Sequence, residues 1–195
     1  MIALDGLSLL KRMADAVAAV EDRLLRATAA LNAAGIPYAV VGGNAVGVWV
    51  ATVDKAAVRN TQDVDILIRR ADLPAVTAAM ESAGFTYRHV NKLDIFLDGP
   101  NAKIRDSVHI VFAGEKVRDH ENFSNPDVAE SVEAKQYKIV ALEALVRIKL
   151  TAYRDKDRTH LRDLLEVGLI DAAWMAKLPA ELGQRLQALI DTPEG

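Results

Sequence analysis

Two short motifs constrain the fold of this chain more than any other feature of its sequence. The first is the pair Gly42-Gly43, which follows the apolar segment 38–41. The second is formed by Asp63 and Asp65, which alternate with apolar residues. Consecutive glycines after a strand allow a sharp turn that brings backbone N–H groups close to a ligand. Aspartates at alternate positions of a strand point to the same face. We therefore predict a strand, a glycine turn, a short helix and a second strand, over residues 62–68, that carries two carboxylates.

The chemistry of these motifs points to phosphate and a divalent cation. Two neighbouring carboxylates repel each other unless a cation lies between them, and Mg²⁺ often binds one or two carboxylates together with substrate phosphates. We predict that Asp63 and Asp65 bind Mg²⁺, with Mn²⁺ as the alternative ion. A helix capped by Asn44 would point its N–H groups at phosphate. Each motif alone also has a purely structural explanation, as a close-packed turn or a solvated strand face.

The composition is that of an ordinary globular protein. The chain has 195 residues, of which 51% are hydrophobic, and a net charge of −3. This length predicts one domain, or one domain with a helical extension. The absence of cysteine excludes disulfides, thiolate zinc sites and cysteine nucleophiles and fits a cytoplasmic protein. The most apolar segment, 36–51, is too short to span a bilayer, so we expect no membrane association.

Hydrophobic periodicity predicts the remaining elements and an α+β fold. We expect a small mixed β-sheet with helices packed on it and a C-terminal helical cap. The expected elements are helices over 6–34, 44–51 and 72–83, strands over 38–41, 85–89, 93–97 and 107–112, a loop over 114–135, and helices from 140 onwards. We expect three regions: an N-terminal helical segment (1–35), a core (36–120), and a loop followed by C-terminal helices (121–195).

Further polar residues accompany the two motifs. Arg59 and Thr61 precede the aspartates, where Arg59 could pair with a carboxylate or a phosphate. The segment from Lys149 to Asp163 is rich in basic residues. On spacing alone, this segment is equally well explained as a solvated pair of helices linked by ion pairs.

Together these motifs resemble the nucleotidyltransferase superfamily, which shares the polymerase-beta-like fold. Gly-Gly followed by Asp-x-Asp is the signature of that superfamily. The sequence is also similar to the minimal bacterial nucleotidyltransferase-like proteins related to abortive-infection and toxin nucleotidyltransferases. Their Arg-x-Thr-x-Asp-x-Asp strand is matched by Arg59, Thr61, Asp63 and Asp65. Their Lys-Leu-x-Ala-x-Arg-x-Lys-Asp helix and the acid after it are matched by Lys149, Leu150, Ala152, Arg154, Lys156, Asp157 and Asp163.

The resemblance implies a role for each matched residue, with residues 36–120 as a nucleotidyltransferase-like core. Residues implied to bind the nucleotide are Gly42, Gly43, Asn44, Arg59, Thr61, Arg154, Lys156 and Asp157. Asp63 and Asp65 would hold the metal and act in catalysis. Lys149 and Arg154 would neutralise phosphate, and Asp157 would orient a basic neighbour.

The sequence departs from the pattern at one position. Active members of this fold use a third carboxylate from a later strand to position the metal that activates the attacking hydroxyl. The expected strand is 107–112, whose inward polar residue is His109. Histidine is a poor ligand for magnesium, but His109 could act as a general base or simply be a hydrogen-bonded histidine beside the sheet. Asp94 and Asp106 are the alternative acids.

Three functions are compatible with this sequence. The first is transfer of a nucleoside monophosphate from a nucleoside triphosphate to an unknown hydroxyl acceptor, with Mg²⁺. The second is a catalytically impaired member of the fold, which binds nucleotide or a partner as in toxin–antitoxin systems. The third is a toxin that modifies RNA through the basic cluster 147–162; the net charge of −3 does not favour it.

Overall fold

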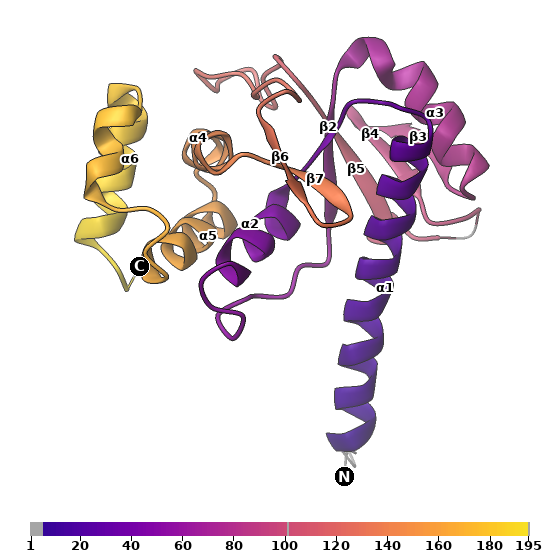
Figure 1. Cartoon of the computed structure of the whole chain (residues 1–195), viewed down its shortest axis with the longest axis horizontal. Coiled ribbons are helices and arrows are strands. Elements are labelled where there is room, and N and C mark those ends of the chain that lie inside the picture. Colours follow the sequence, from indigo (N-terminus) through magenta and orange to yellow (C-terminus); the bar gives the residue numbers. More distant parts are fainter. Residues whose placement is uncertain (1–5, 101, 195) are drawn as a thin grey trace.

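A seven-stranded mixed β-sheet forms the centre of the computed structural model, which describes residues 6–100 and 102–194 (Figure 1). The strands lie in the order β3-β4-β5-β2-β1-β7-β6. Strand β2 runs parallel to β5, β1 runs parallel to β7, and the other neighbours are antiparallel. The strands are β1 (Ala39–Val41), β2 (Val64–Ile68), β3 (Thr86–Val90), β4 (Leu93–Leu97), β5 (Ser107–Phe112), β6 (Ser131–Ala134) and β7 (Tyr137–Val140).

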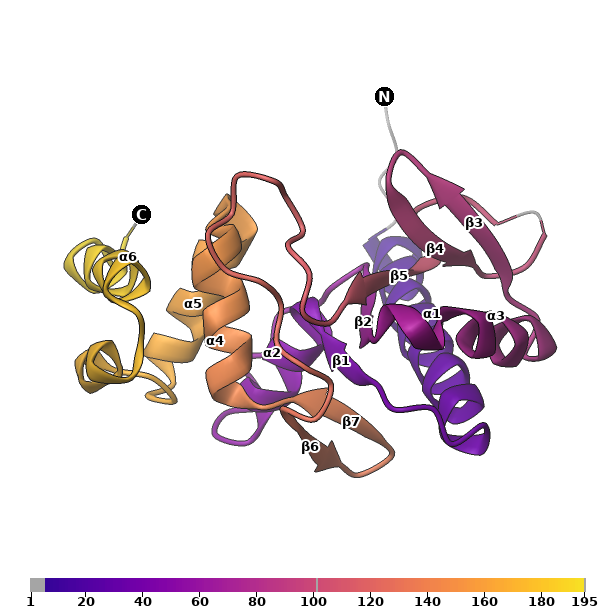
Figure 2. The same ribbon diagram turned by 90° about the horizontal axis from the view of Figure 1, so that it is seen from above.

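Helices pack around this sheet in two groups (Figure 2). Helices α1 and α3 pack against each other, and α1 also contacts β2, β5 and β7, whereas α2 packs on β1 and β2 together with α4 and α5, and α6 packs outside them. The helices are α1 (Gly6–Ala33), α2 (Gly42–Ala51), α3 (Leu73–Ser82), α4 (Leu142–Ala152), α5 (Asp155–Glu166) and α6 (Ala180–Asp191), with short 3₁₀ helices at Arg70–Asp72 and Ala172–Lys177. The predicted α+β class and the C-terminal helical cap are confirmed.

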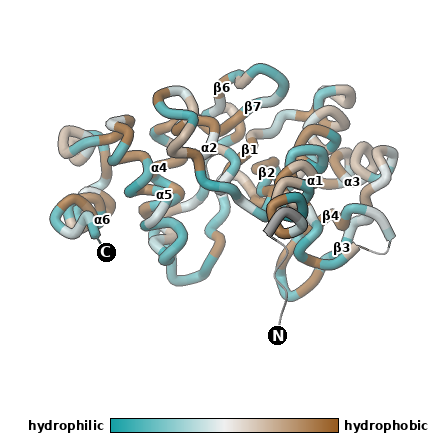
Figure 3. The backbone as a smooth tube through the Cα atoms, turned by 90° about the horizontal axis from the view of Figure 1, so that it is seen from below, coloured by the Kyte–Doolittle hydropathy of each residue, from teal (hydrophilic) through white to brown (hydrophobic). Residues whose placement is uncertain are grey.

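Strand β2 is buried at every residue except Asp65, and its sequence explains why. Val64, Ile66, Leu67 and Ile68 are fully buried, because β1 and β5 flank the strand and helices cover it. A strand buried on both faces requires a nearly continuous apolar run. Asp65 is the single polar residue of β2, so it marks where the core opens to solvent. Figure 3 shows hydrophobic residues recurring in β1 and β2 and polar residues in the outer loops.

The prediction of a loop over 114–135 is wrong for its last part. Strand β6 forms there and pairs with β7, which in turn pairs with β1. Its sequence, Ser-Val-Glu-Ala, is short and lies at the sheet edge, where side chains stay accessible to solvent. Such an edge strand lacks the apolar pattern that marks a buried strand. In the part of the chain that the structure describes, no helix is long and apolar enough to cross a membrane.

Helix α1 is one continuous helix, and only its second half packs on the body. Leu24, Ala27 and Leu31 are buried in the core. The first half extends beyond the sheet and the other helices (Figure 1). The helix ends before Gly35, whose φ of +65° is suited to glycine. Residues 1–5 of the expected N-terminal segment lie outside the described residues.

Candidate active site

The glycine pair connects β1 directly to α2. Gly42 has a φ of +69°, and α2 begins at this residue with Val41 as its N-cap. The prediction that Asn44 caps the helix is therefore wrong, because the positive φ lets the helix begin without a connecting residue. Asn44 instead donates a side-chain hydrogen bond to the backbone carbonyl of Asp63 at 2.7 Å. Asn44 thus fixes the chain just before β2.

The glycines are needed because the two motifs touch each other. A Cβ atom on Gly42 would lie 2.0 Å from Oδ2 of Asp65, and one on Gly43 would lie 2.7 Å from Oγ1 of Thr61. Contacts this short cannot be relieved without displacing the carboxylate or the hydroxyl. The glycine turn and the aspartate strand therefore form one site, in which the N-terminus of α2 lies against the Asp65 carboxylate.

The two aspartates are accessible and only loosely paired. Asp65 lies in β2, whereas Asp63 immediately precedes the strand, which begins two residues later than predicted. Their side chains are 42% and 21% exposed for Asp63 and Asp65 respectively. Oδ2 of Asp63 lies 3.7 Å from Nζ of Lys156, and Oδ1 of Asp65 lies 3.5 Å from Nδ1 of His109. Both carboxylates therefore keep oxygen lone pairs available for a ligand.

His109 occupies the third position of the site on β5. It is the register partner of Asp65 in the parallel β2–β5 pair, so the two side chains share a face. Burial alone would raise the pKa of Asp65, but His109, Lys149 and Lys156 together hold that pKa below its usual value. The contact with Asp65 likewise raises the pKa of His109.

Neither of the alternative acids reaches this site. Asp94 pairs in register with Ile110, one residue beyond His109, so its side chain points to the opposite face of the sheet. There it accepts hydrogen bonds from the Tyr87 hydroxyl at 2.5 Å and contacts His89 at 2.9 Å. Asp106 precedes β5 and lies 3.8 Å from the Arg23 guanidinium of α1. Within residues 6–100 and 102–194, no group of three or more acidic or histidine side chains is arranged to hold a metal ion.

A buried ion-pair network supports the site from α4 and α5. Nζ of Lys149 lies 3.0 Å from Oδ1 of Asp157, and Nε of Arg154 donates to Oδ2 of Asp157 at 2.6 Å. Lys149 and Asp157 are almost completely buried. Burial lowers the pKa of Lys149 despite the opposing charge of Asp157. Burial would raise the pKa of Asp157, but the bonds from Arg154 and Lys149 outweigh it and lower that pKa.

Helix α5 is also tied to the loop that enters β2. Nε of Arg59 donates to both carboxylate oxygens of Asp163, at 2.8 and 3.0 Å. Of the two partners predicted for Arg59, the structure thus shows the carboxylate. The Thr61 hydroxyl lies 3.4 Å from the backbone nitrogen of Asp63, within the same loop. Together with Lys156 on Asp63, these contacts join residues 59–63 to α5.

A protein family that the sequence matches agrees with the geometry of this site. A family model described as "Uncharacterised nucleotidyltransferase" matches residues 8–161. The chain belongs to this nucleotidyltransferase family. The predicted superfamily resemblance is thereby confirmed, and the matched span includes every predicted site residue. No curated protein matches the sequence.

Several solved nucleotidyltransferase structures are similar to this chain in fold. The solution structure of the antibiotic-resistance factor ANT(2'')-Ia has a TM-score of 0.51 and 15% identity, covering 90% of this chain and 91% of that one. The crystal structure of ANT(2'')-Ia in complex with adenylyl-2''-tobramycin has a TM-score of 0.50 and 16% identity, with coverage of 87% and 95%. An antigenic nucleotidyltransferase-like protein from Paracoccidioides brasiliensis has a TM-score of 0.51 and 16% identity, with coverage of 89% and 90%. At these identities the similarity shows a shared fold alone.

Two residues near the site of this chain could not be identified from the sequence pattern. Glu121, in the loop after β5, is only 7% exposed, and its Oε1 has no partner among the described residues. Its charge acts on Arg154, which places it near the site. His160, on α5, is a half-buried histidine whose pKa is lowered to about 4 by its partial burial and by Lys149. Both are single polar residues within polar segments, so no spacing distinguishes them.

The residues present fit a divalent cation. Asp63 and Asp65 supply hard carboxylate oxygens, which Mg²⁺ and Mn²⁺ prefer. Among the described residues, each carboxylate has one loose contact with a basic side chain, so a cation would not have to break a tight ion pair. The start of α2 beside Asp65 provides backbone N–H donors for phosphate oxygens. The set is incomplete only at the third position, where a histidine replaces an acid.

Proposed function

We propose that this protein transfers a nucleoside monophosphate from a nucleoside triphosphate to a hydroxyl acceptor. The observation that carries the proposal is the contact between the two motifs, in which the Cα of Gly42 abuts the Asp65 carboxylate. A phosphate held by the N-terminus of α2 would therefore lie directly beside the cation ligands. This arrangement suits metal-assisted phosphoryl chemistry, in which catalysis is mostly positioning and charge neutralisation.

Each residue of the site has a separate role in the proposed reaction. The backbone of Gly42, Gly43 and Asn44 binds phosphate oxygens. Asp63 and Asp65 hold Mg²⁺ or Mn²⁺, which when bound neutralises phosphate charge and polarises the reacting phosphorus–oxygen bond. The acceptor oxygen forms a bond to the α-phosphorus, and the bond from that phosphorus to the bridging oxygen of the β-phosphate breaks. Pyrophosphate leaves with the electron pair.

The basic residues differ in their distance from the proposed substrate. Lys149 is buried and bound to Asp157, so it supports the site through its positive charge rather than by contact with substrate. Arg154 and Lys156 have side chains that are 41% and 54% exposed and can reach a bound phosphate. Arg59 contributes by holding α5 through Asp163.

His109 is proposed to accept the proton of the acceptor hydroxyl. Its ring lies beside Asp65 on the face where the acceptor must approach. A base must be neutral to accept a proton. The raised pKa of His109 favours the charged ring in the free protein, so this step requires the contact with Asp65 to weaken when substrate binds.

For the acceptor we propose a small molecule that carries both a hydroxyl and a cationic group. The unpartnered carboxylate oxygen of Glu121 is suited to an ammonium or a hydroxyl donor. A hydroxyl of this kind is consistent with the ANT(2'')-Ia crystal structure, which contains adenylyl-2''-tobramycin. RNA is less suited, because Arg147 and Arg158 of the basic cluster are each paired with a carboxylate.

A second candidate function is nucleotide binding without transfer. It is favoured by the lack of an acid at the third position of the site, which His109 occupies. Asp94 and Asp106 instead make contacts with residues outside the site. In this case the protein would act as a nucleotide sensor or as a partner-binding module of a toxin–antitoxin type.

Thermal denaturation with each of the four nucleoside triphosphates, with and without Mg²⁺, tests both functions. Nucleotide at about 100 times its Kd stabilises a folded protein by about 2.7 kcal/mol, which is about 5–10 °C for a chain of this length. We expect such a shift only with Mg²⁺, and its loss in Asp63→Asn/Asp65→Asn. Asp155→Asn is the matched control, because this carboxylate is 92% exposed and bound to Arg158.

The two functions are separated by following the phosphate. Transfer from α-labelled triphosphate to a panel of amine-bearing alcohols, with pyrophosphate release, supports the enzyme. A Mg²⁺-dependent shift that is not accompanied by transfer or pyrophosphate release supports the binding module. If none of the triphosphates shifts the melting temperature in the presence of Mg²⁺, both nucleotide transfer and nucleotide binding are refuted.

A further inference from the structure

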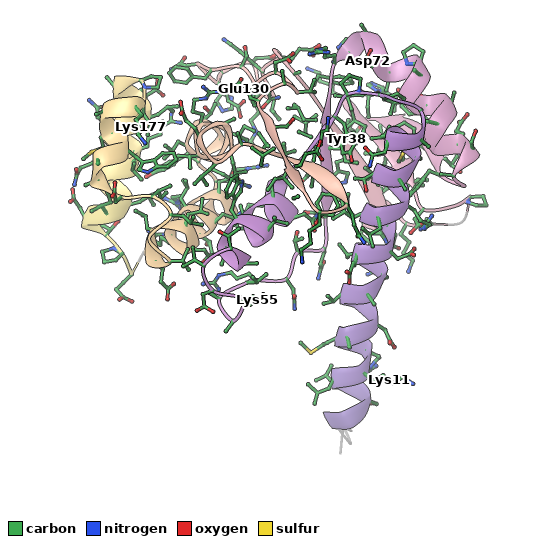
Figure 4. All side chains as sticks on the ribbon, viewed as in Figure 1. Lys11, Tyr38, Lys55, Asp72, Glu130 and Lys177 are labelled. Carbon is green, nitrogen blue, oxygen red and sulfur yellow. The ribbon has the colours of Figure 1, made fainter. Side chains whose placement is uncertain are left out.

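The first half of α1 exposes a stripe of apolar side chains. Leu9, Leu10, Met13 and Val17 are 47%, 64%, 54% and 40% exposed. They lie on the part of the helix that extends beyond the body of the protein, where Lys11 points into solvent (Figures 1 and 4). Isolated exposed apolar residues are normal on a protein surface, but four large ones on two turns of one helix form a patch that favours association.

This stripe continues the one that packs α1 on the core. Apolar residues follow a heptad pattern along the whole helix, at Leu10, Met13, Val17, Val20, Leu24, Ala27 and Leu31. The last three are buried in the core, and Val20 packs at its edge. A heptad of this kind is the seam through which one helix packs against another. The seam therefore runs past the edge of its own domain without a partner among the described residues.

A shallow groove lies along this free part of the seam. Its volume is about 400 Å³, and it is lined by Met13, Ala14, Val17, Ala18, Glu21 and Asn60. The two alanines have small side chains, so a second helix could approach α1 closely at this groove. Asn60 belongs to the loop that enters β2, between Arg59 and Thr61. The groove therefore connects the seam to the edge of the candidate active site.

The charged residues on the groove side of α1 are complementary to those of a second α1 helix that runs in the opposite direction. Lys11, Ala14, Ala18 and Glu21 succeed one another along one side of α1, with a base at one end and an acid at the other. Rotation by two-fold symmetry about the middle of this row brings each Lys11 opposite Glu21 of a second helix, and each Ala14 opposite Ala18. The same rotation places Met13 about 3 Å along the helix axis from the level of Val17 of the second helix, so the two side chains lie within one turn of each other. Helix pairs gain from such opposite charges at their flanking positions.

We propose that the first half of α1 pairs with the same segment of a second copy of this chain, in an antiparallel arrangement. A parallel arrangement is disfavoured because the seam that would face the second helix also faces the body, so both bodies would occupy the same space. In the antiparallel arrangement the two bodies lie at opposite ends of the paired segment. The partner helix then rests in the groove and against Asn60.

The pairing has a consequence for the site. The segment 59–63 carries Arg59, Thr61 and Asp63, and Asn60 at the groove belongs to it. A partner helix that contacts Asn60 would hold this loop in place. The dimer is proposed independently of nucleotide transfer, and it requires neither bound metal nor nucleotide.

Sedimentation velocity over about 1–200 µM full-length chain tests the proposal. We expect a species of twice the monomer mass of 21.2 kDa. Burying two large apolar side chains per copy contributes enough that Met13→Glu/Val17→Glu should weaken dimerisation by more than about 100-fold. Val117→Glu is the matched control, because Val117 is 56% exposed on a distant loop. Circular dichroism should show the same helix content in all of these variants, since the changed residues are exposed.

A charge exchange tests the antiparallel register. Lys11→Glu should weaken the dimer by about 3–30-fold, since it removes two symmetric attractive pairs and introduces repulsion. Lys11→Glu/Glu21→Lys should restore the wild-type dissociation constant to within about threefold. A protein that stays monomeric at the highest concentration would overturn the proposal. So would a dimer that tolerates Met13→Glu/Val17→Glu, or one in which the double exchange fails to recover what Lys11→Glu loses.

Discussion

The half-buried histidine of α5 should make the stability of this protein depend on pH. His160 has its pKa lowered from an ordinary value of 6.5 to about 4, first by burial and then by the charge of Lys149. Lys156 adds to this effect, whereas Asp157 and Asp163 oppose it. As the pH falls through 6.5, the unfolded chain takes up a proton at this position and the folded chain does not. His160 therefore contributes stability that is complete above this pH and is lost progressively towards pH 4.

The magnitude follows from the two pKa values. Between about pH 7.5 and pH 4.5, protonation of the unfolded form alone lowers the free energy of unfolding by about 2.5 kcal/mol. This is a large fraction of the 5–15 kcal/mol that stabilises a typical domain. In His160→Gln the contribution is absent, so the free energy of unfolding of the variant should fall by about 2.5 kcal/mol less over the same interval.

Urea denaturation at a series of pH values, followed by the fluorescence of the two tryptophans, measures this difference. His120→Gln is the control, because His120 lies exposed on a loop. The control should follow the wild type at every pH. The reasoning is refuted if wild type and His160→Gln lose the same free energy of unfolding between neutral and acid pH.

Three further predictions follow from contacts at the site. Gly168→Ala should lose about 1 kcal/mol of stability from its positive φ, and Gly42→Ala should lose more, because its Cβ would also meet the Asp65 carboxylate. Gly42→Ala alone should also remove the Mg²⁺-dependent nucleotide shift, because only its Cβ meets a carboxylate. Asp157→Ala should cost about 3–5 kcal/mol in urea denaturation by leaving Lys149 buried and unpaired, and Lys149→Met/Asp157→Leu should recover most of this loss. Glu121→Gln should raise the melting temperature by about 2–4 °C, because a buried carboxylate without a full set of partners is removed, while transfer to cationic acceptors falls.

Local pattern was sufficient to predict the strands that build the site. Strands β4 and β5 begin and end where alternation and turn residues place them, and β2 is two residues shorter than expected. Period-two patterning also placed His109 on the face of Asp65, which the register confirms. These features depend on neighbouring residues only, so a single sequence contains them.

Contacts between distant segments could not be predicted in the same way. Arg59 and Asp163 are separated by 104 residues, and spacing did not indicate which acid Arg59 would meet. Periodicity also groups Leu10 and Leu24 in one stripe, yet Leu10 is 64% exposed and Leu24 is 4% exposed. Periodicity shows which residues share a face of the helix. Which of those residues are buried depends on how far along the helix the rest of the protein extends.

The ion pairs of the site are of two kinds. The partly exposed pairs can be replaced by contacts with a ligand, whereas the buried pair cannot. Lys156 on Asp63 and His109 on Asp65 are long, partly exposed contacts, and such pairs contribute at most about 1 kcal/mol. The proposed cation and nucleotide would therefore replace them at little cost in free energy. Lys149 on Asp157 is buried, and breaking it would strand a charge in the core. The same helix, α5, thus supplies a fixed anchor through Asp157 and a replaceable cation through Lys156. In the proposed function, nucleotide would then enter next to Asp63 while α5 stays in position.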